Sequence, residues 1–170
     1  MDSKQIEKIL WSNVNTKKYF IGCFPADKIP RVIKHPASLV VNLDKSTKLG
    51  SHWVAIFVRD EQTVEYFDSF GPLNCLYPLK QKKTTLHTKE NCLTEPNTDI
   101  YEFLHQFKSI KINKSVYQSI FAPNCGHYCI FFIYTISLGI PFKKILAILD
   151  KQPNPNYFVS EFVRKITSKD

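Results

Sequence analysis

The run from Cys125 to Leu138 constrains the fold more than any other part of this sequence. It is apolar on every side when placed on a helix, which is typical of a helix buried in the centre of a domain. Pro123 and Asn124 precede the run, and Gly139 and Pro141 terminate it. Because a helix of this kind must be covered all round, the rest of the chain has to supply layers that pack against it.

Strand character appears in three runs earlier in the chain, which are separated by short turn-like segments. They span Ser38 to Asn42, His52 to Arg59 and Thr63 to Asp68, and their spacing predicts neighbouring strands. A further strand is expected from Ile110 to Gln118. The segment from Asn15 to Pro36, rich in proline and aromatic residues, is expected to be irregular and to lie where it could line a binding groove.

Four more helices are expected around these strands. The first has Asp2 or Ser3 as its cap and ends near Asn13. The others are a helix capped by Asn97 or Thr98 that carries Ile100, Phe103, Leu104 and Phe107, one from Phe142 to Lys151, and one from Tyr157 to Lys169. With 44% hydrophobic and 14% aromatic residues, the chain can fill one core. We therefore expect an α+β fold, a central mixed β-sheet packed against the buried helix, as a single domain over residues 1–170.

Cys125 stands in the first turn of the expected central helix. Unpaired backbone N–H groups and the helix dipole favour an anion at that place, so its thiol should ionise readily. A thiolate is the attacking species in acyl transfer, and a neighbouring imidazole lowers the pKa of the thiol further. Taken alone, Cys125 fits a buried inert cysteine better than a nucleophile.

His52 begins one expected strand and Asp68 ends the next, with an intervening turn short enough for antiparallel pairing. The two side chains should then meet at one edge of the sheet. A carboxylate on one imidazole nitrogen fixes the tautomer and leaves the other nitrogen to take the proton of a thiol. An ordinary hydrogen-bonded pair would give the same pattern, and only Cys125 as third partner favours catalysis.

Gln118 precedes Cys125 by enough chain to finish a strand, turn and begin the helix. Its amide could then reach the neighbourhood of the thiol. Together with the backbone N–H of Cys125 it would offer two donors to the negative oxygen of a tetrahedral intermediate. An exposed glutamine of a strand is the alternative.

Four motifs carry these residues in the order His, Asp, Gln, Cys. They read Gly50-Ser51-His52-Trp53, Tyr66-Phe67-Asp68-Ser69-Phe70-Gly71, and Gln118 with Asn124-Cys125-Gly126-His127-Tyr128-Cys129. In this order, and over about Tyr19 to Tyr134, the chain resembles the adenovirus-protease family. The string from Cys125 to Cys129 looks especially like the proteases of Maverick/Polinton transposons and their viral relatives. The SUMO-deconjugating proteases share the order and are the runner-up.

The resemblance implies a papain-like, adenain-like cysteine endopeptidase that needs no cofactor and has Cys125, His52, Asp68 and Gln118 as catalytic residues. Its substrate would be a capsid or other structural precursor, cut after glycine. Trp53 would form a wall of a narrow channel for small residues, although a core tryptophan is an equal alternative. The flanking motif residues would also contact substrate: Gly50, Ser51, Asn124 and Gly126.

The chain departs from the adenovirus enzymes in two ways that the resemblance makes visible. Those enzymes have glutamate where this chain has Asp68, and they have a longer tail after the nucleophile. They are also stimulated by DNA and by a viral peptide held through a disulfide. No cysteine stands at the matching distance before Gln118, so the disulfide-linked peptide is not carried over, and a DNA or peptide activator is an implication of the resemblance alone.

The other histidines and cysteines give weaker signals. His127 is turned away from Cys125 on a helix and is interpreted as structural. Cys129 lies one turn beyond Cys125, but no second cluster with ligand spacing accompanies it, so no metal is expected. The remaining candidates have no convincing partner: His35, His87, His105, Cys23, Cys75 and Cys92.

Charge and compartment complete the expectations. The net charge of +8 comes from lysines grouped at Lys80, Lys82, Lys83, Lys108, Lys111, Lys114, Lys143 and Lys144. Such groups can follow phosphates, so DNA binding is a secondary hypothesis beside a solvated surface. The first ten residues lack a secretory layout, and five cysteines without framework spacing favour a reducing intracellular compartment, by resemblance the host nucleus or the virion. We expect a monomer without a membrane-spanning segment.

Overall fold

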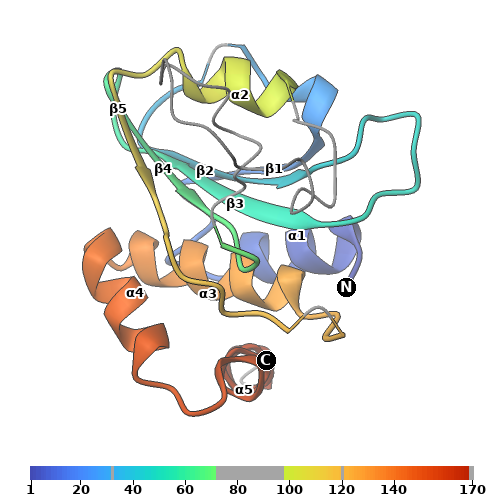
Figure 1. Cartoon of the computed structure of the whole chain (residues 1–170), viewed down its shortest axis with the longest axis vertical. Helices are drawn as coiled ribbons and strands as arrows, with labels where there is room; N and C mark the ends of the chain where they lie inside the picture. The colour runs from blue at the N-terminus through green and yellow to red at the C-terminus, as the bar shows by residue number, and fades with distance from the viewer. Residues whose placement is uncertain (32, 72–97, 120, 169–170) are drawn as a thin grey trace, which may run out of the picture.

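A five-stranded mixed sheet crosses the middle of the molecule in the computed structural model, which describes residues 1–31, 33–71, 98–119 and 121–168 (Figure 1). The strands run in spatial order β1 (Phe20–Pro25), β2 (Ala37–Asn42), β3 (Trp53–Val58), β4 (Thr63–Phe67) and β5 (Ser109–Ile112). The inner pairs β2–β3 and β3–β4 are antiparallel, and the outer pairs β1–β2 and β4–β5 are parallel. The expected α+β class with a central mixed sheet is confirmed.

Helices cover both faces of this sheet (Figure 1). One face carries α2 (Thr98–Leu104) and the short 3-10 helix η1 (Ala26–Lys28). The other face carries α3 (Cys125–Ser137), and α1 (Ser3–Ser12), α4 (Phe142–Asp150) and α5 (Pro155–Thr167) surround α3. The sheet therefore separates two hydrophobic clusters.

The alternation of the central strand explains why the sheet is buried on both sides. Ala55 and Phe57 of β3 point toward the cluster around α3, whereas Val54, Ile56 and Val58 point toward the cluster around α2. Successive side chains of a strand face opposite sides, so a strand covered on both faces must be apolar at nearly every position. The side chains of β3 therefore contribute to both hydrophobic clusters.

The central helix is buried as its all-round apolar character predicts. Ile130, Phe131, Phe132 and Ile133 are each at most 2% exposed. The ring of Phe132 stacks on Phe67 of β4 with centroids 5.1 Å apart, which fastens α3 to the sheet. No helix in the described ranges is both long and apolar enough to cross a membrane.

Two expectations about the strands are wrong. The segment from Asn15 to Pro36 is not irregular throughout, because it contains the edge strand β1 and the helix η1. This strand has an irregular register and Gly22 at a φ of 136°, so it lacks the alternation by which strands are recognised. The strand expected from Ile110 to Gln118 ends at Ile112.

The early end of β5 has a local cause. Asn113 is fully buried, and its amide bonds the backbone of Asp68 from both sides, accepting from the N–H at 2.9 Å and donating to the carbonyl at 2.7 Å. The chain therefore stops pairing with β4 after Ile112 and runs beside the turn that follows β4. Outside the described residues lie the expected cap Asn97, together with His87, Cys75, Cys92, Lys80, Lys82 and Lys83.

Candidate active site

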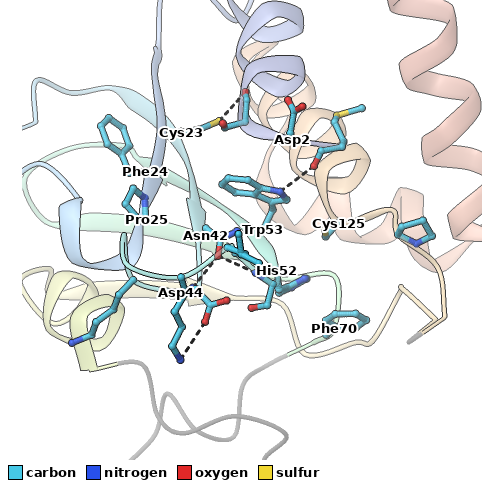
Figure 2. Close-up of a pocket in the computed structure, with 18 of the residues that line it drawn as sticks. Asp2, Cys23, Phe24, Pro25, Asn42, Asp44, His52, Trp53, Phe70 and Cys125 are labelled. Carbon is cyan, nitrogen blue, oxygen red and sulfur yellow. Dashed lines mark hydrogen bonds and ion pairs between the residues drawn. The ribbon is translucent and has the colours of Figure 1, made fainter.

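Cys125 opens helix α3 at the edge of a groove of about 730 Å³. One wall comes from the start of α1 and the end of β1, another from the β2–β3 loop, and a third from the segment that leads into α3. The half-buried thiol of Cys125 lies close to His52 and Trp53 in this groove (Figure 2). The predicted segment Asn15 to Pro36 does line it, through Cys23, Phe24 and Pro25.

The structure brings His52 and Asp68 together, as antiparallel pairing of their strands predicts. His52 immediately precedes β3 and Asp68 immediately follows β4, and both side chains are buried. Nε2 of His52 lies 2.7 Å from Oδ1 of Asp68. Since the carboxylate accepts, Nε2 carries the proton in the neutral ring, and Nδ1 is left as the basic nitrogen.

Nδ1 of His52 is buried and has no hydrogen-bond partner of normal geometry in the described part of the chain. The thiol of Cys125 is nevertheless close enough to shift the pKa of the ring. Such contacts are often long in the resting state of an enzyme and shorten when substrate binds. The thiol and Nδ1 are therefore close enough to influence each other's ionisation.

Neighbouring groups hold Asp68 and His52 in this arrangement. Oδ1 of Asp68 also accepts from the backbone N–H of Phe70 at 2.8 Å, and Oδ2 accepts from the hydroxyl of Tyr66 at 3.4 Å. The ring of Phe70 lies against the imidazole with centroids 4.4 Å apart. The carboxylate thus has donors on both oxygens, and the imidazole has little freedom to turn.

The two ionisable partners have opposite pKa shifts. Burial alone would raise the pKa of Cys125, but interaction with His52 and backbone hydrogen bonds from Trp53 and Gly126 hold that pKa below its usual value. Burial alone would lower the pKa of His52, but the hydrogen bond to Asp68, the thiol and the two negative charges raise it to about 9. A thiolate facing an imidazolium is the form these shifts favour at neutral pH.

Gln118 is buried next to this pair rather than exposed on a strand. Its Nε2 donates to the carbonyl of Ala122, and its Oε1 accepts from the hydroxyl of Ser69 at 2.6 Å. Gln118, Ala122 and Cys125 line the same groove. The amide nitrogen carries a second N–H group besides the one that donates to Ala122.

Trp53, Gly50 and Ser51 line the groove, and their contact with substrate stays a prediction. The indole of Trp53 donates to the carbonyl of Met1 at 3.2 Å and also packs on the core (Figure 2). Gly50 has a φ of 91°, and a Cβ there would lie 2.7 Å from Nδ2 of Asn42. Only glycine suits this turn into His52.

Asn124 and Gly126 are not among the residues that line the groove, and their expected contact with substrate stays a prediction. The amide of Asn124 instead donates to the carbonyl of Asn156 and to the hydroxyl of Ser160, tying α3 to α5. A Cβ on Gly126 would lie 3.2 Å from atoms of Met1 and Ile6. Both positions serve the packing of helices around α3.

Two of the weaker candidates, His127 and Cys129, do not line this groove. His127 lies in a second groove between α1 and α5, and burial lowers its pKa. Cys129 is fully buried, and burial raises its pKa well above the usual value. Within the described ranges no group of three or more histidine, cysteine or acidic side chains could hold a metal ion.

Selective alkylation follows from the shifts at Cys125. At pH 6 to 7 iodoacetamide is expected to modify Cys125 at least tenfold faster than Cys23, since burial raises the pKa of Cys23 far above that of an ordinary thiol. In His52→Ala the increase of the Cys125 alkylation rate with pH should begin at a higher pH. Mass spectrometry of the peptides measures both rates. Equal rates for the two cysteines would contradict a depressed pKa at Cys125.

Several residues that build the site are absent from the sequence-based expectations. Oδ1 of Asn42 accepts from the backbone N–H groups of Asp44 and Ser51, which shapes the loop that carries Gly50 into the groove. An asparagine at the end of a strand before a loop is a usable signal for such a turn. Asn113 and Ser69 have no comparable local signal, because their partners are distant in sequence.

Comparison with known proteins gives one family. Residues 24–163 match the model of the Ulp1 protease family, C-terminal catalytic domain. The match covers all four of His52, Asp68, Gln118 and Cys125. A search among curated proteins finds no match to this sequence.

Proposed function

The chain belongs to the Ulp1 protease family and is a cysteine protease, and on that premise we propose that Cys125, His52, Asp68 and Gln118 are its catalytic residues. The observation that carries this assignment is the buried 2.7 Å contact between His52 and Asp68, which leaves Nδ1 on the side of the thiol at the tip of α3. These proteases use protein side chains alone and need no cofactor.

In the proposed reaction Nδ1 of His52 already holds the proton of the thiol, and the thiolate of Cys125 attacks the scissile carbonyl carbon. The backbone N–H of Cys125 and the free N–H of Gln118 stabilise the negative oxygen of the tetrahedral intermediate. Nδ1 then returns the proton to the leaving amine, and a thioester remains. Water activated by His52 hydrolyses the thioester, while Asp68 stabilises the imidazolium throughout.

We propose that cleavage follows glycine and that the substrate is a capsid or other structural precursor of a virus or transposon, as the resemblance implies. Trp53 lines the groove next to His52, which supports a channel that suits a residue without a side chain. A reducing intracellular compartment, with the host nucleus or the virion by resemblance, fits a free thiol nucleophile. One domain over residues 1–170 and a monomeric state stay predictions.

Removal of a ubiquitin-like modifier is the second candidate, and the match to the Ulp1 family favours it. SUMO carrying a C-terminal electrophile is expected to trap Cys125 covalently if the chain is a deconjugase. Under the first proposal, the wild-type chain should instead cut candidate precursors after glycine, with the new ends mapped by mass spectrometry. Efficient trapping without precursor cleavage would replace the first proposal with the second.

Non-specific DNA binding through the basic surface is a further prediction. Lys143 and Lys144 are exposed on α4, but Lys111 pairs with the buried Glu65 at 2.8 Å and so is less available to a phosphate. Affinity for duplex DNA should fall steeply as salt is raised. Affinity that does not change with salt would exclude this role.

A further inference from the structure

Ser69 directly follows the catalytic candidate Asp68 in the sequence and is 1% exposed. Its hydroxyl lies 2.6 Å from Oε1 of Gln118, which is itself 4% exposed. A buried hydroxyl or amide without a hydrogen-bond partner destabilises a protein. Ser69 and Gln118 avoid this cost by bonding each other.

The chemistry of the neighbours determines which way the Gln118 amide faces. The carbonyl oxygen of Ala122 can only accept, so the atom of Gln118 next to it must be the nitrogen. The amide oxygen then faces Ser69, whose hydroxyl must donate. One N–H of the amide is bound to Ala122, and the other is left for the groove.

The backbone fixes the same two segments relative to each other. The carbonyl of Ser69 accepts from the N–H groups of Tyr117 and Gln118, both at 2.9 Å. The base of the Gln118 side chain is therefore anchored to Ser69, and so is the oxygen at its far end. Among the described residues no other donor reaches Oε1.

We propose that Ser69 is a positioning residue that holds the Gln118 amide with its free N–H directed at the developing oxyanion. This inference rests on the proposed role of Gln118 in catalysis. Without the hydroxyl, Oε1 would have no buried donor, and the amide could rotate about its terminal bond or flip. Because an oxyanion donor acts on the transition state, the loss should fall on kcat and leave KM nearly unchanged.

A double-mutant cycle tests the inference. The purified chain and the variants Ser69→Ala, Gln118→Ala and the double variant are assayed with a fluorogenic peptide that ends in Gly-Gly-aminomethylcoumarin. Gln118→Ala should lower kcat about 10²-fold to 10³-fold, and Ser69→Ala about 10-fold to 100-fold. In the Gln118→Ala background, removing Ser69 should cost less than about twofold, because residues that act as a unit are not additive.

Two results would overturn the inference: an unchanged kcat for Ser69→Ala, or the same loss in both backgrounds. The rate of Cys125 alkylation by iodoacetamide should be unchanged in Ser69→Ala, since that reaction needs no oxyanion donor. If Ser69→Ala does not fold, Ser69→Cys, which keeps a weak donor, should still fold and lower kcat. A wild-type chain that alkylates normally but cleaves no peptide would overturn the proposed function and the inference with it.

Discussion

Cys125→Ala is expected to abolish peptide hydrolysis, lowering kcat by about 10⁶-fold, the loss seen when the nucleophile of a comparable triad is removed. The reason is that, among the described residues, the other cysteine of the groove cannot replace it. Cys23 lines the same groove, but burial and the carboxylate of Glu7 raise its pKa. At neutral pH Cys23 is therefore protonated and a poor nucleophile.

The experiment compares wild type, Cys125→Ala and the matched control Cys23→Ala on one peptide substrate. The control should retain activity within about threefold, because the hydrogen bond that the thiol of Cys23 donates to the carbonyl of Ser3 is weak, at 3.8 Å. The far-UV circular dichroism of all three proteins should coincide. Activity that remains in Cys125→Ala and is lost in Cys23→Ala would mean that Cys23, and not Cys125, is the nucleophile.

The sequence predicts the part of the site that depends on periodicity and on element ends. The all-round apolar run gave helix α3, which places Cys125 at a helix N-terminus. The short turn between two apolar runs predicts antiparallel β3 and β4, and this pairing brings His52 to Asp68. Both predictions use only local sequence patterns. Such patterns predict the structure correctly where the local preference agrees with burial in the fold.

The rest of the site depends on contacts between distant segments, which one sequence does not reveal. Asn113 ends β5 because its amide binds the backbone 45 positions earlier. Asn124 stands beside the nucleophile, yet its side chain turns to α5 because its partners there are 32 and 36 positions away. Adjacency in sequence to a catalytic candidate is therefore a poor guide to where a side chain points.

Asp68→Asn tests how the carboxylate of Asp68 acts. The substitution is expected to lower kcat/KM about 10³-fold. In the triad template the same change costs about 10⁴-fold because the wrong imidazole tautomer forms. Here the backbone N–H of Phe70 donates to Oδ1, so the oxygen of the asparagine should stay on that side and keep accepting from Nε2. The imidazole of His52 should then keep its tautomer, and the fall in kcat/KM should come from the loss of the negative charge.

The pH profile separates charge from tautomer. In wild type the alkaline limb of kcat/KM should lie near the pKa of His52, about 9, because the imidazolium must donate its proton to the leaving amine. Replacing the carboxylate by a neutral amide weakens the hydrogen bond to His52 and removes the charge of Asp68, and both raise the pKa of His52 in wild type. The limb should therefore move to lower pH. Asp68→Ala, which also loses the acceptor, should be less active than Asp68→Asn. A limb that stays near pH 9 in Asp68→Asn would mean that the carboxylate only orients the ring, and the electrostatic role assigned to it would be wrong.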